Sequence, residues 1–361
     1  MRTAIVTTTI YVPKLLADYV ADAKKYNHEC SFIVVGDKKT PPEAADFCKQ
    51  LDADIRFFDV ADQEKYLERF PELKEHLVWN SIQRRNVGIL FAYDEGADQI
   101  ITIDDDNFLV DENFIGLHEV GKEKNLDIIS SATNWLNVCD FLSEERDRRF
   151  YHRGFPPEKR FLDENPETKK EFRKVVVNAG LWLEDPDIDA LTRLYFPNQP
   201  INALKYNRAD NFALAKNTYS PFNSQNTALH RDVVPAYFLS PLVGRYDDIW
   251  ASYIIKRIAD HLGDAVAFGK PIVRQKRNSH NYWKDLDQET MGMILTDRFV
   301  TLLRNIPLTE KTYGECYREL VSGLEREYEK QNLNEKEKRY LRGYLRGMHV
   351  WLTTFARLGN L

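Results

Sequence analysis

The stretch Gln99–Asp106, QIITIDDD, places a short apolar run directly before three consecutive aspartates. The run Gln99–Ile103 consists mainly of isoleucine and threonine, which is typical of a strand buried on both faces of a parallel sheet. The stretch therefore predicts a strand that ends in a loop carrying the carboxylates of Asp104, Asp105 and Asp106.

Strand and helix patterns alternate along the chain before this stretch. We expect strands at Thr3–Ile10, Ser31–Val35 and Ile55–Phe58, and helices at Tyr11–Tyr26, Pro42–Leu51 and Trp79–Glu95. Repeated strand–helix–strand units predict an α/β protein whose mostly parallel, Rossmann-type sheet is flanked by helices. Ligands of such sheets collect at the carboxyl ends of the strands, and the acidic triplet lies at one of these ends.

The chain after the triplet is organised differently. Residues 134–223 are rich in Pro, Asn and charge and show less regular patterns. Helical periodicity returns at Asp247–Leu262, and everything beyond about Gln288 has the pattern of amphipathic helices. We therefore expect two domains, a main domain at residues 1–290 and a C-terminal helical appendage at residues 291–361.

Composition excludes several classes of protein. The 361 residues are 43% hydrophobic and 29% charged, which is ordinary for a soluble enzyme. A net charge of −6 argues against broad attraction to nucleic acid or anionic membranes. No run of apolar residues is long enough for a membrane span, and the four cysteines form no cluster. We expect a cytoplasmic protein.

The acidic triplet has the chemistry of a cation site. Asp104 and Asp106 are two residues apart at the end of a strand, so their side chains point to the same side. Two converging carboxylates suit a hard divalent cation that also binds substrate phosphates. Asp105 points the other way, where it could hydrogen-bond a sugar or ribose. The alternative interpretation is a solvated acidic turn without function.

Four ordered blocks resemble one known family. They are TIDDDN (Thr102–Asn107), RGFPPEKR (Arg153–Arg160), AGLWLEDPDIDALTRL (Ala179–Leu194) and GRYDDIWASYIIKRIADHLG (Gly244–Gly263). The blocks are similar to segments of the reversibly glycosylated polypeptide family, whose plant members are UDP-arabinopyranose mutases on a GT-A glycosyltransferase fold. The resemblance reaches about residue 290, and the helices after it do not match the family.

The resemblance implies a GT-A-like catalytic domain that binds a UDP-sugar, UDP-arabinose or a related one. The implied activity is the interconversion of the pyranose and furanose forms of the sugar through cleavage and re-formation of the sugar–diphosphate bond. Two alternatives stay open: a glycosyltransferase that passes the sugar to an external acceptor, and a non-enzymatic UDP-sugar-binding scaffold. No G-x-G-x-x-G follows the first strand, so we expect no flavin.

The resemblance also implies roles for individual residues. Asp104, Asp105 and Asp106 would bind the metal and the nucleotide sugar, and Arg160 would take the position of the reversibly glycosylated arginine. Because a guanidinium is a poor nucleophile, Arg160 could instead bind the departing diphosphate. It could also be a surface arginine of a basic loop.

Residues in the last third of the main domain complete the predicted site. Asp247 and Asp248 could orient sugar hydroxyls or act as a base, or they could cap the following helix. His280 is our candidate third metal ligand and would favour Mn²⁺ over Mg²⁺, although a histidine in a polar loop often has no such role. Nearby Arg274, Lys276 and Arg277 would suit a diphosphate or form a solvated basic loop.

Nucleotide contacts are expected at the ends of the first two strands. Thr7, Thr8 and Thr9 end the first strand, and their alternative explanation is plain β-propensity. Asp37 follows the second strand and could accept from the uracil N3–H. By family position Trp182 and Asn226 form a pocket wall, although Trp182 could equally be core.

The apolar stripes of the C-terminal helices predict a packing surface. Leu341, Tyr344, Leu345 and Val350 recur at helical spacing. We expect this stripe to pack against the main domain or a second subunit, and hence a homo-oligomer.

Overall fold

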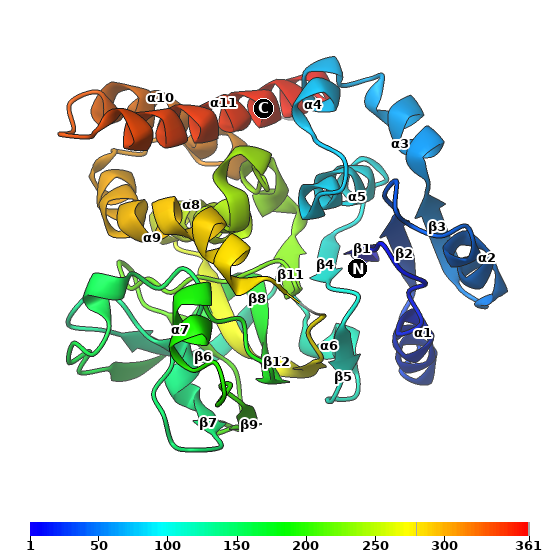
Figure 1. Cartoon of the computed structure of the whole chain (residues 1–361), viewed down its shortest axis with the longest axis horizontal. Helices are drawn as coiled ribbons and strands as arrows, with labels where there is room; N and C mark the ends of the chain where they lie inside the picture. The colour runs from blue at the N-terminus through cyan, green and yellow to red at the C-terminus, as the bar shows by residue number, and fades with distance from the viewer. Residues whose placement is uncertain (279, 360–361) are drawn as a thin grey trace.

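The computed structural model describes residues 1–278 and 280–359. Its first half is a parallel α/β unit (Figure 1). The strands are β1 (Thr3–Thr8), β2 (Cys30–Val35), β3 (Asp54–Phe58) and β4 (Gln99–Ile103), paired in parallel in the order β3-β2-β1-β4. The intervening helices are α1 (Leu16–Lys25), α2 (Glu43–Gln50), α3 (Val60–Leu67), α4 (Pro71–His76) and α5 (Arg85–Asp94). The predicted α/β class is confirmed.

Beyond β4 the sheet becomes mixed. The further strands are β5 (Asn107–Leu109), β6 (Glu123–Ser130), β7 (Leu142–Glu144), β8 (Glu167–Glu184), β9 (Ala203–Tyr206), β10 (Phe212–Leu214), β11 (Asn226–His230) and β12 (Ala265–Gln275). The order continues β4-β11-β8-β6-β10-β12-β5, and β11 is antiparallel to both of its neighbours. The expectation of a mostly parallel sheet holds for β1–β4, whereas the rest of the sheet combines the parallel pairs β6–β10 and β8–β12 with antiparallel ones. Antiparallel pairs do not need the helical crossovers on which that expectation was based.

Several predicted elements have shifted boundaries: for example, the first strand ends at Thr8 rather than Ile10, and the first helix begins at Leu16 rather than Tyr11. The expected helix Trp79–Glu95 is only helical from a short 3-10 turn at Ile82–Arg84 onwards, because the preceding loop is held by Asp37. The region expected to be irregular contains β8, whose 18 residues make it the longest strand described. By contrast β4 and the helix α8 (Asp247–Leu262) begin and end as predicted.

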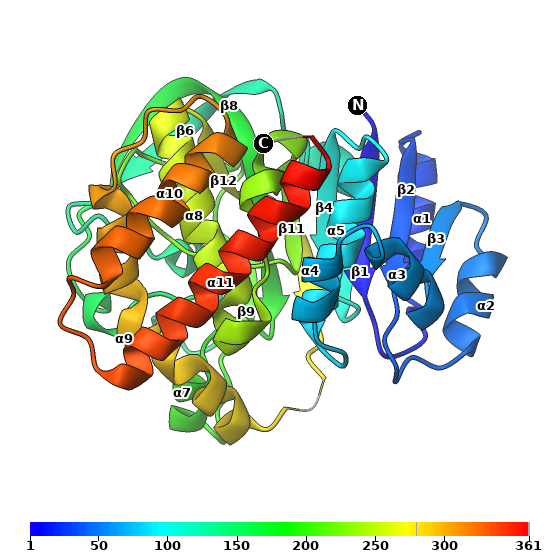
Figure 2. The same ribbon diagram turned by 90° about the horizontal axis from the view of Figure 1, so that it is seen from above.

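Helices cover one face of the second half of the sheet. Besides α8 they are α9 (Tyr282–Asn305), α10 (Tyr313–Tyr328) and α11 (Glu335–Arg357), whereas α6 (Phe114–Leu117) packs beside α1 and β12, and α7 (Ala190–Tyr195) packs against α9. In Figures 1 and 2, α8 and α9 lie nearer the sheet, and α10 and α11 form the outermost layer. Within the described residues, no helix has both the length and the apolar character required to cross a membrane.

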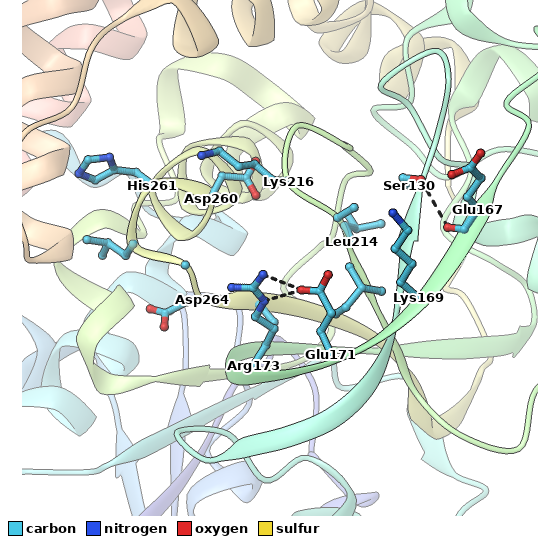
Figure 3. Close-up of a pocket in the computed structure, with 15 residues that line it drawn as sticks. Ser130, Glu167, Lys169, Glu171, Arg173, Leu214, Lys216, Asp260, His261 and Asp264 are labelled. Carbon is cyan, nitrogen blue, oxygen red and sulfur yellow. Dashed lines mark hydrogen bonds and ion pairs between the residues drawn. The ribbon is translucent and has the colours of Figure 1, made fainter.

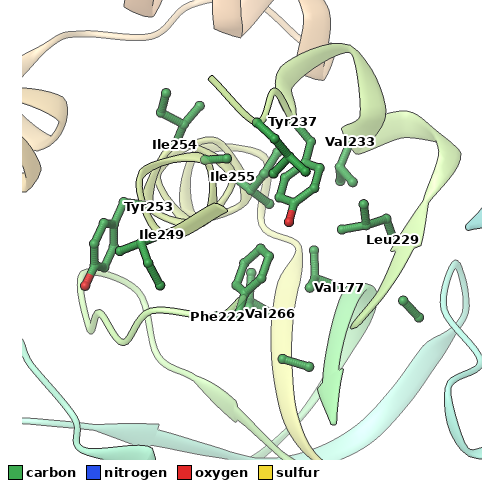
Figure 4. Close-up of a cluster of buried hydrophobic side chains, with 14 of the residues drawn as sticks. Val177, Phe222, Leu229, Val233, Tyr237, Ile249, Tyr253, Ile254, Ile255 and Val266 are labelled. Atoms are coloured by element: carbon green, nitrogen blue, oxygen red, sulfur yellow. The ribbon is translucent and has the colours of Figure 1, made fainter. Parts of the chain in front are cut away.

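The helix α8 is buried on two sides. Toward the sheet, Ile249 and Ile255 lie in a cluster with Val177 of β8 and Val266 of β12 (Figure 4). On its other side, the Trp250 ring stacks on a phenylalanine of α9 at 4.2 Å and meets a tyrosine of α11 edge-on at 5.0 Å. Since burial of apolar area is the main stabilising contribution, α8 is the centre of the core and its N-terminus is firmly placed.

The C-terminal helices share this core. Leu341, Tyr344 and Leu345 are buried within the chain, and Val350 is partly buried. Residue 290, the expected boundary, lies inside α9. The division into two domains and the homo-oligomer stay predictions, and the apolar stripe that suggested an oligomer is covered by the protein itself.

Candidate functional site

A cavity of about 560 Å³ lies between the ends of β1 and β4 and the N-terminus of α8. Eight of the residues singled out from the sequence line it: Thr8, Asp104, Asp105, Asp106, Asp247, Asp248, Arg277 and His280. The sequence placed these residues on distant segments, and the fold brings them to one hollow at the carboxyl ends of the parallel strands, where ligands of such sheets bind.

The three carboxylates of the triplet have different partners. Asp104 forms an ion pair with the buried guanidinium of Arg85. Asp105 accepts a hydrogen bond from Thr9 Oγ1 at 2.6 Å. Asp106 has a buried oxygen, Oδ1, that has no hydrogen-bond partner within the described part of the chain. Burial and the nearby charge of Asp104 raise the pKa of Asp106 to about 7.

Asp247 and Asp248, the acid pair at the start of α8, also differ from each other in their hydrogen-bond partners. Asp247 accepts a hydrogen bond from Gln83 Nε2 at 2.8 Å, and burial together with neighbouring Asp248 raises its pKa to about 7. Asp248 accepts from the Ser224 backbone N–H at 3.0 Å and from Arg153 at 3.2 Å. One carboxyl of the pair can therefore carry a proton near neutral pH, while the other is held as an acceptor.

Arg153 is a central residue that the sequence did not single out. It is buried and forks onto Asp187, with Nε–Oδ1 and Nη2–Oδ2 distances of 3.0 and 2.9 Å, besides binding Asp248. Burial acts to lower the pKa of Arg153, but Asp187 and Asp248 raise it well above its usual value. Its position at the start of the RGFPPEKR block was the signal that could have identified it.

Arg160 lies elsewhere. Its guanidinium forms an ion pair with Asp189, which also caps α7 by accepting from the Thr192 N–H at 2.7 Å. Arg160 is not among the described residues that line the cavity. Its predicted role as the sugar-carrying arginine stays a prediction, and in this structure it holds the start of α7.

Asp37 holds a loop that forms part of the cavity wall. Its carboxylate accepts from the backbone N–H groups of Asn80 and Ser81 at 2.9 and 3.1 Å. Those two loop residues line the cavity, whereas Asp37 does not line it in the described structure. With both oxygens engaged, Asp37 shapes the wall, and its contact with uracil stays a prediction.

The remaining predicted contacts lie in the sheet. Trp182 is buried with its ring 5.3 Å from that of His152. Asn226 is fully buried and bonds the carbonyl of Pro271 at 3.0 Å. Thr7 is buried in β1. Among the described cavity-lining residues none of these three occurs, so the core interpretation of Trp182 matches its position.

The donors present only partly fit a metal ion. No group of three or more His, Cys, Asp or Glu side chains in residues 1–278 and 280–359 is arranged to hold one. His280 is engaged, since its Nδ1 lies 2.9 Å from Asp285 Oδ2. However, the unpartnered oxygen of Asp106 beside Asp104 is the kind of donor that a hard cation takes, and phosphate oxygens can complete such a shell.

A second cavity, of about 520 Å³, lies beside β8 and the end of α8 (Figure 3). Several of its charged groups already have partners: Glu171 accepts from Arg173 at 2.6 Å, and Asp264 accepts from the Tyr313 hydroxyl at 3.0 Å. The buried Lys256 of α8 forms an ion pair with Asp260. Because these groups are engaged within the protein, this cavity is the weaker candidate.

In this protein, acidic and basic side chains converge in a cavity at the strand ends of an α/β sheet. This arrangement is typical of α/β proteins that bind a charged ligand. The model for "Reversibly glycosylated polypeptide" matches residues 5–359, so the expectation that the family resemblance ends near residue 290 is wrong. The chain belongs to the reversibly glycosylated polypeptide family.

Relatives in plants are similar over part of their length. UDP-arabinopyranose mutase 2 of Arabidopsis thaliana is 31% identical over 231 residues, 61% of this chain and 59% of the relative. UDP-arabinopyranose mutase 1 of the same plant is 32% identical over 168 residues, 44% of this chain and 46% of the relative. For probable UDP-arabinopyranose mutase 4 the identity is 28% over 273 residues, 72% of this chain and 68% of the relative. The chain thus spans between about half and two thirds of these curated relatives.

Among solved structures, the apo form of mouse xyloside xylosyltransferase 1 is 12% identical, with 82% of this chain and 81% of that chain covered. The TM-score is 0.27, which is too low to establish a shared fold.

Proposed function

We propose that this protein is an enzyme that binds a UDP-sugar in the cavity of the acidic triplet and interconverts its pyranose and furanose forms. The observation that carries the proposal is the meeting of Asp104–Asp106 with Asp247 and Asp248 in one cavity. The names of the plant relatives, UDP-arabinopyranose mutases, support UDP-arabinose or a related sugar as substrate.

The triplet would hold a divalent cation, Mn²⁺ or Mg²⁺. Asp104 and Asp106 would be its carboxylate ligands, and His280 would join them only after releasing Asp285. When bound, such an ion neutralises the diphosphate charge that develops as the sugar leaves. The unpartnered Oδ1 of Asp106 supports this assignment.

The acid pair, Asp247 and Asp248, would donate and accept the protons that are transferred during the isomerisation. The C1–oxygen bond to the diphosphate breaks and re-forms, so the nucleotide is recovered unchanged. During ring exchange another sugar hydroxyl bonds to C1 and loses its proton, and the bond from C1 to the old ring oxygen breaks as that oxygen gains a proton, so bonds and protons balance. Asp247, whose pKa of about 7 lies near neutral pH, can donate and take back this proton.

Arg153 would position this machinery. It holds Asp248 through hydrogen bonds of 3.2 Å and is itself fixed by Asp187. A carboxylate with locked geometry can orient sugar hydroxyls more precisely than one on a mobile side chain.

The test is an assay without any acceptor. Purified protein is incubated with UDP-arabinopyranose and Mn²⁺, and the products are separated chromatographically and identified by the NMR signal of the anomeric proton. We expect UDP-arabinofuranose, and none with D247N. Turnover only when a sugar acceptor is added would overturn the mutase assignment and favour the glycosyltransferase.

A further inference from the structure

Four arginines line the cavity, and one of them differs from the others in its partners. They are Arg85, Arg153, Arg245 and Arg277. The first three donate hydrogen bonds to carboxylates, namely Asp104, Asp187 and Glu289. Arg277 has only longer ion pairs, with its Nε 3.4 Å from Asp185 and its Nη2 3.7 Å from Asp187.

The charge of Arg277 is poorly compensated. Its Nε and Nη2 are buried without a hydrogen-bond partner in the described part of the chain. The two nearby carboxylates form closer ion pairs with other arginines, Asp185 with Arg193 at 2.7 Å and Asp187 with Arg153 at 2.9 Å. Burial and neighbouring Arg193 lower the pKa of Arg277. Leaving buried donors unpaired is costly, so the arrangement is suited to an anion supplied from outside.

The backbone holds Arg277 beside the triplet. Its neighbour Lys276 donates its N–H to the Asp106 carbonyl at 3.1 Å, and Gln275 pairs with Asn107 across β12 and β5. An anion held at Asp104–Asp106 through a cation is therefore within the same corner of the cavity as the guanidinium.

We infer that Arg277 binds the diphosphate of the substrate and compensates its charge together with any metal ion. The inference rests on the proposed function, because a diphosphate is expected only if the cavity takes a nucleotide sugar. A guanidinium presents parallel N–H donors that match two phosphate oxygens, and this geometry makes arginine well suited to phosphoanhydrides.

The two other cations of this segment are excluded by their surroundings. The side chain of Arg274 is 45% exposed and pairs with Glu184 at 2.7 Å. Lys276 is exposed, with its ammonium 5.3 Å from the centre of the Phe108 ring. Because side chains alternate along an extended segment, Gln275 and Arg277 face the cavity while Arg274 and Lys276 face away. The R274A variant is consequently a matched control.

The experiment measures binding of UDP, UMP and uridine by calorimetry, in Mn²⁺ and in EDTA. For R277A we expect UDP affinity to fall roughly 10–100-fold, as for a lost hydrogen bond to a charged group, with a smaller loss for UMP and none for uridine. R274A should bind all three ligands as the wild type does, and R277K should recover part of the loss for UDP. In EDTA the difference between wild type and R277A should persist.

Three results would overturn the inference. R277A could bind UDP as tightly as the wild type, or it could lose uridine and UDP affinity equally, which would indicate a structural effect. R274A could show the same phosphate-dependent loss. If the wild type binds no UDP, the proposed function fails as well, so the two failures are distinguished by the wild-type measurement.

Discussion

Arg85 and Asp104 form an ion pair at the back of the cavity, in which the arginine side chain is 0% exposed and the aspartate 28%. Arg85 also donates to Ser224 Oγ at 2.8 Å, and this hydroxyl donates to Asp248 at 3.2 Å. One hydrogen-bonded chain thus joins the first carboxylate of the triplet to the acid pair. The two acidic ends of the cavity are held in a fixed relation by a buried arginine.

Replacing Arg85 by methionine should destabilise the protein. The change leaves Asp104 without its partner and removes the bonds to Ser224, and breaking a fully buried pair costs about 3–5 kcal/mol. Because Asp104 is partly exposed, we expect about 2–3 kcal/mol, measured as the free energy of unfolding in urea. The double variant R85M/D104N should recover part of this loss, and a loss below about 0.5 kcal/mol for R85M would contradict the structural role.

Removing the ionisable group at Asp247 should change how stability depends on pH. The pKa of Asp247 is raised in the folded state, so the unfolded chain releases this proton at lower pH than the folded one. The wild type therefore loses stability as pH rises from about 4 to about 7, the value of the folded pKa. D247N keeps an acceptor for Gln83 and escapes this loss.

Unfolding of D247N and wild type should accordingly coincide near pH 4 and diverge above it. The advantage of D247N should grow to a few kcal/mol by pH 8, because the pKa is raised from 3.8 to about 7 and each unit corresponds to about 1.4 kcal/mol. The exposed control D52N should show no such gain. Curves that stay parallel across this range would show that Asp247 is already ionised in the folded protein at pH 5.

Local sequence patterns were sufficient to predict the strand and the helix that position the site. Gln99–Ile103 is a buried strand and Asp247–Leu262 a helix with the predicted bounds, because periodicity and burial act within each segment. The strand end then determines where Asp104 lies. The sequence therefore predicted the carboxylates of Asp104–Asp106 and of Asp247 and Asp248, whereas Asp187, which also lines the cavity, was not predicted.

The arginines that hold those carboxylates were not predictable in this way. Arg153 meets Asp248 across 95 positions of the chain, and Arg85 meets Ser224 across 139. Such contacts arise from the mixed half of the sheet, where β11 returns antiparallel to β4. Local sequence carries no signal for this pairing, and within the RGFPPEKR block the family resemblance pointed to Arg160 rather than to Arg153.

The two arginines of that block give a matched test. In R153K the amine cannot fork onto Asp187 and Asp248 together, so the acid pair loses its orientation. We expect kcat to fall roughly 10²-fold with little change in KM, as for misplaced catalytic groups. R160K keeps a charge for the ion pair with Asp189 and should retain most activity.

Thermal melting and UDP binding would separate this effect from unfolding. Intact-mass measurement after incubation with the UDP-sugar would detect a sugar adduct on the protein. Loss of activity and of an adduct in R160K alone, with R153K unaffected, would restore Arg160 as the sugar-carrying residue.

The last prediction concerns the metal. D106A removes a buried oxygen that has no partner in the described structure, so without metal the variant should be at least as stable as the wild type. In Mn²⁺ at 100 times its Kd, binding adds about 2.7 kcal/mol to wild-type stability, visible as a rise in melting temperature. We expect D106A to lack most of this rise and to lose the effect of Mn²⁺ on UDP affinity, whereas the exposed control D52A keeps both. Equal Mn²⁺-dependent shifts in D106A and wild type would place the cation, if any, away from the triplet.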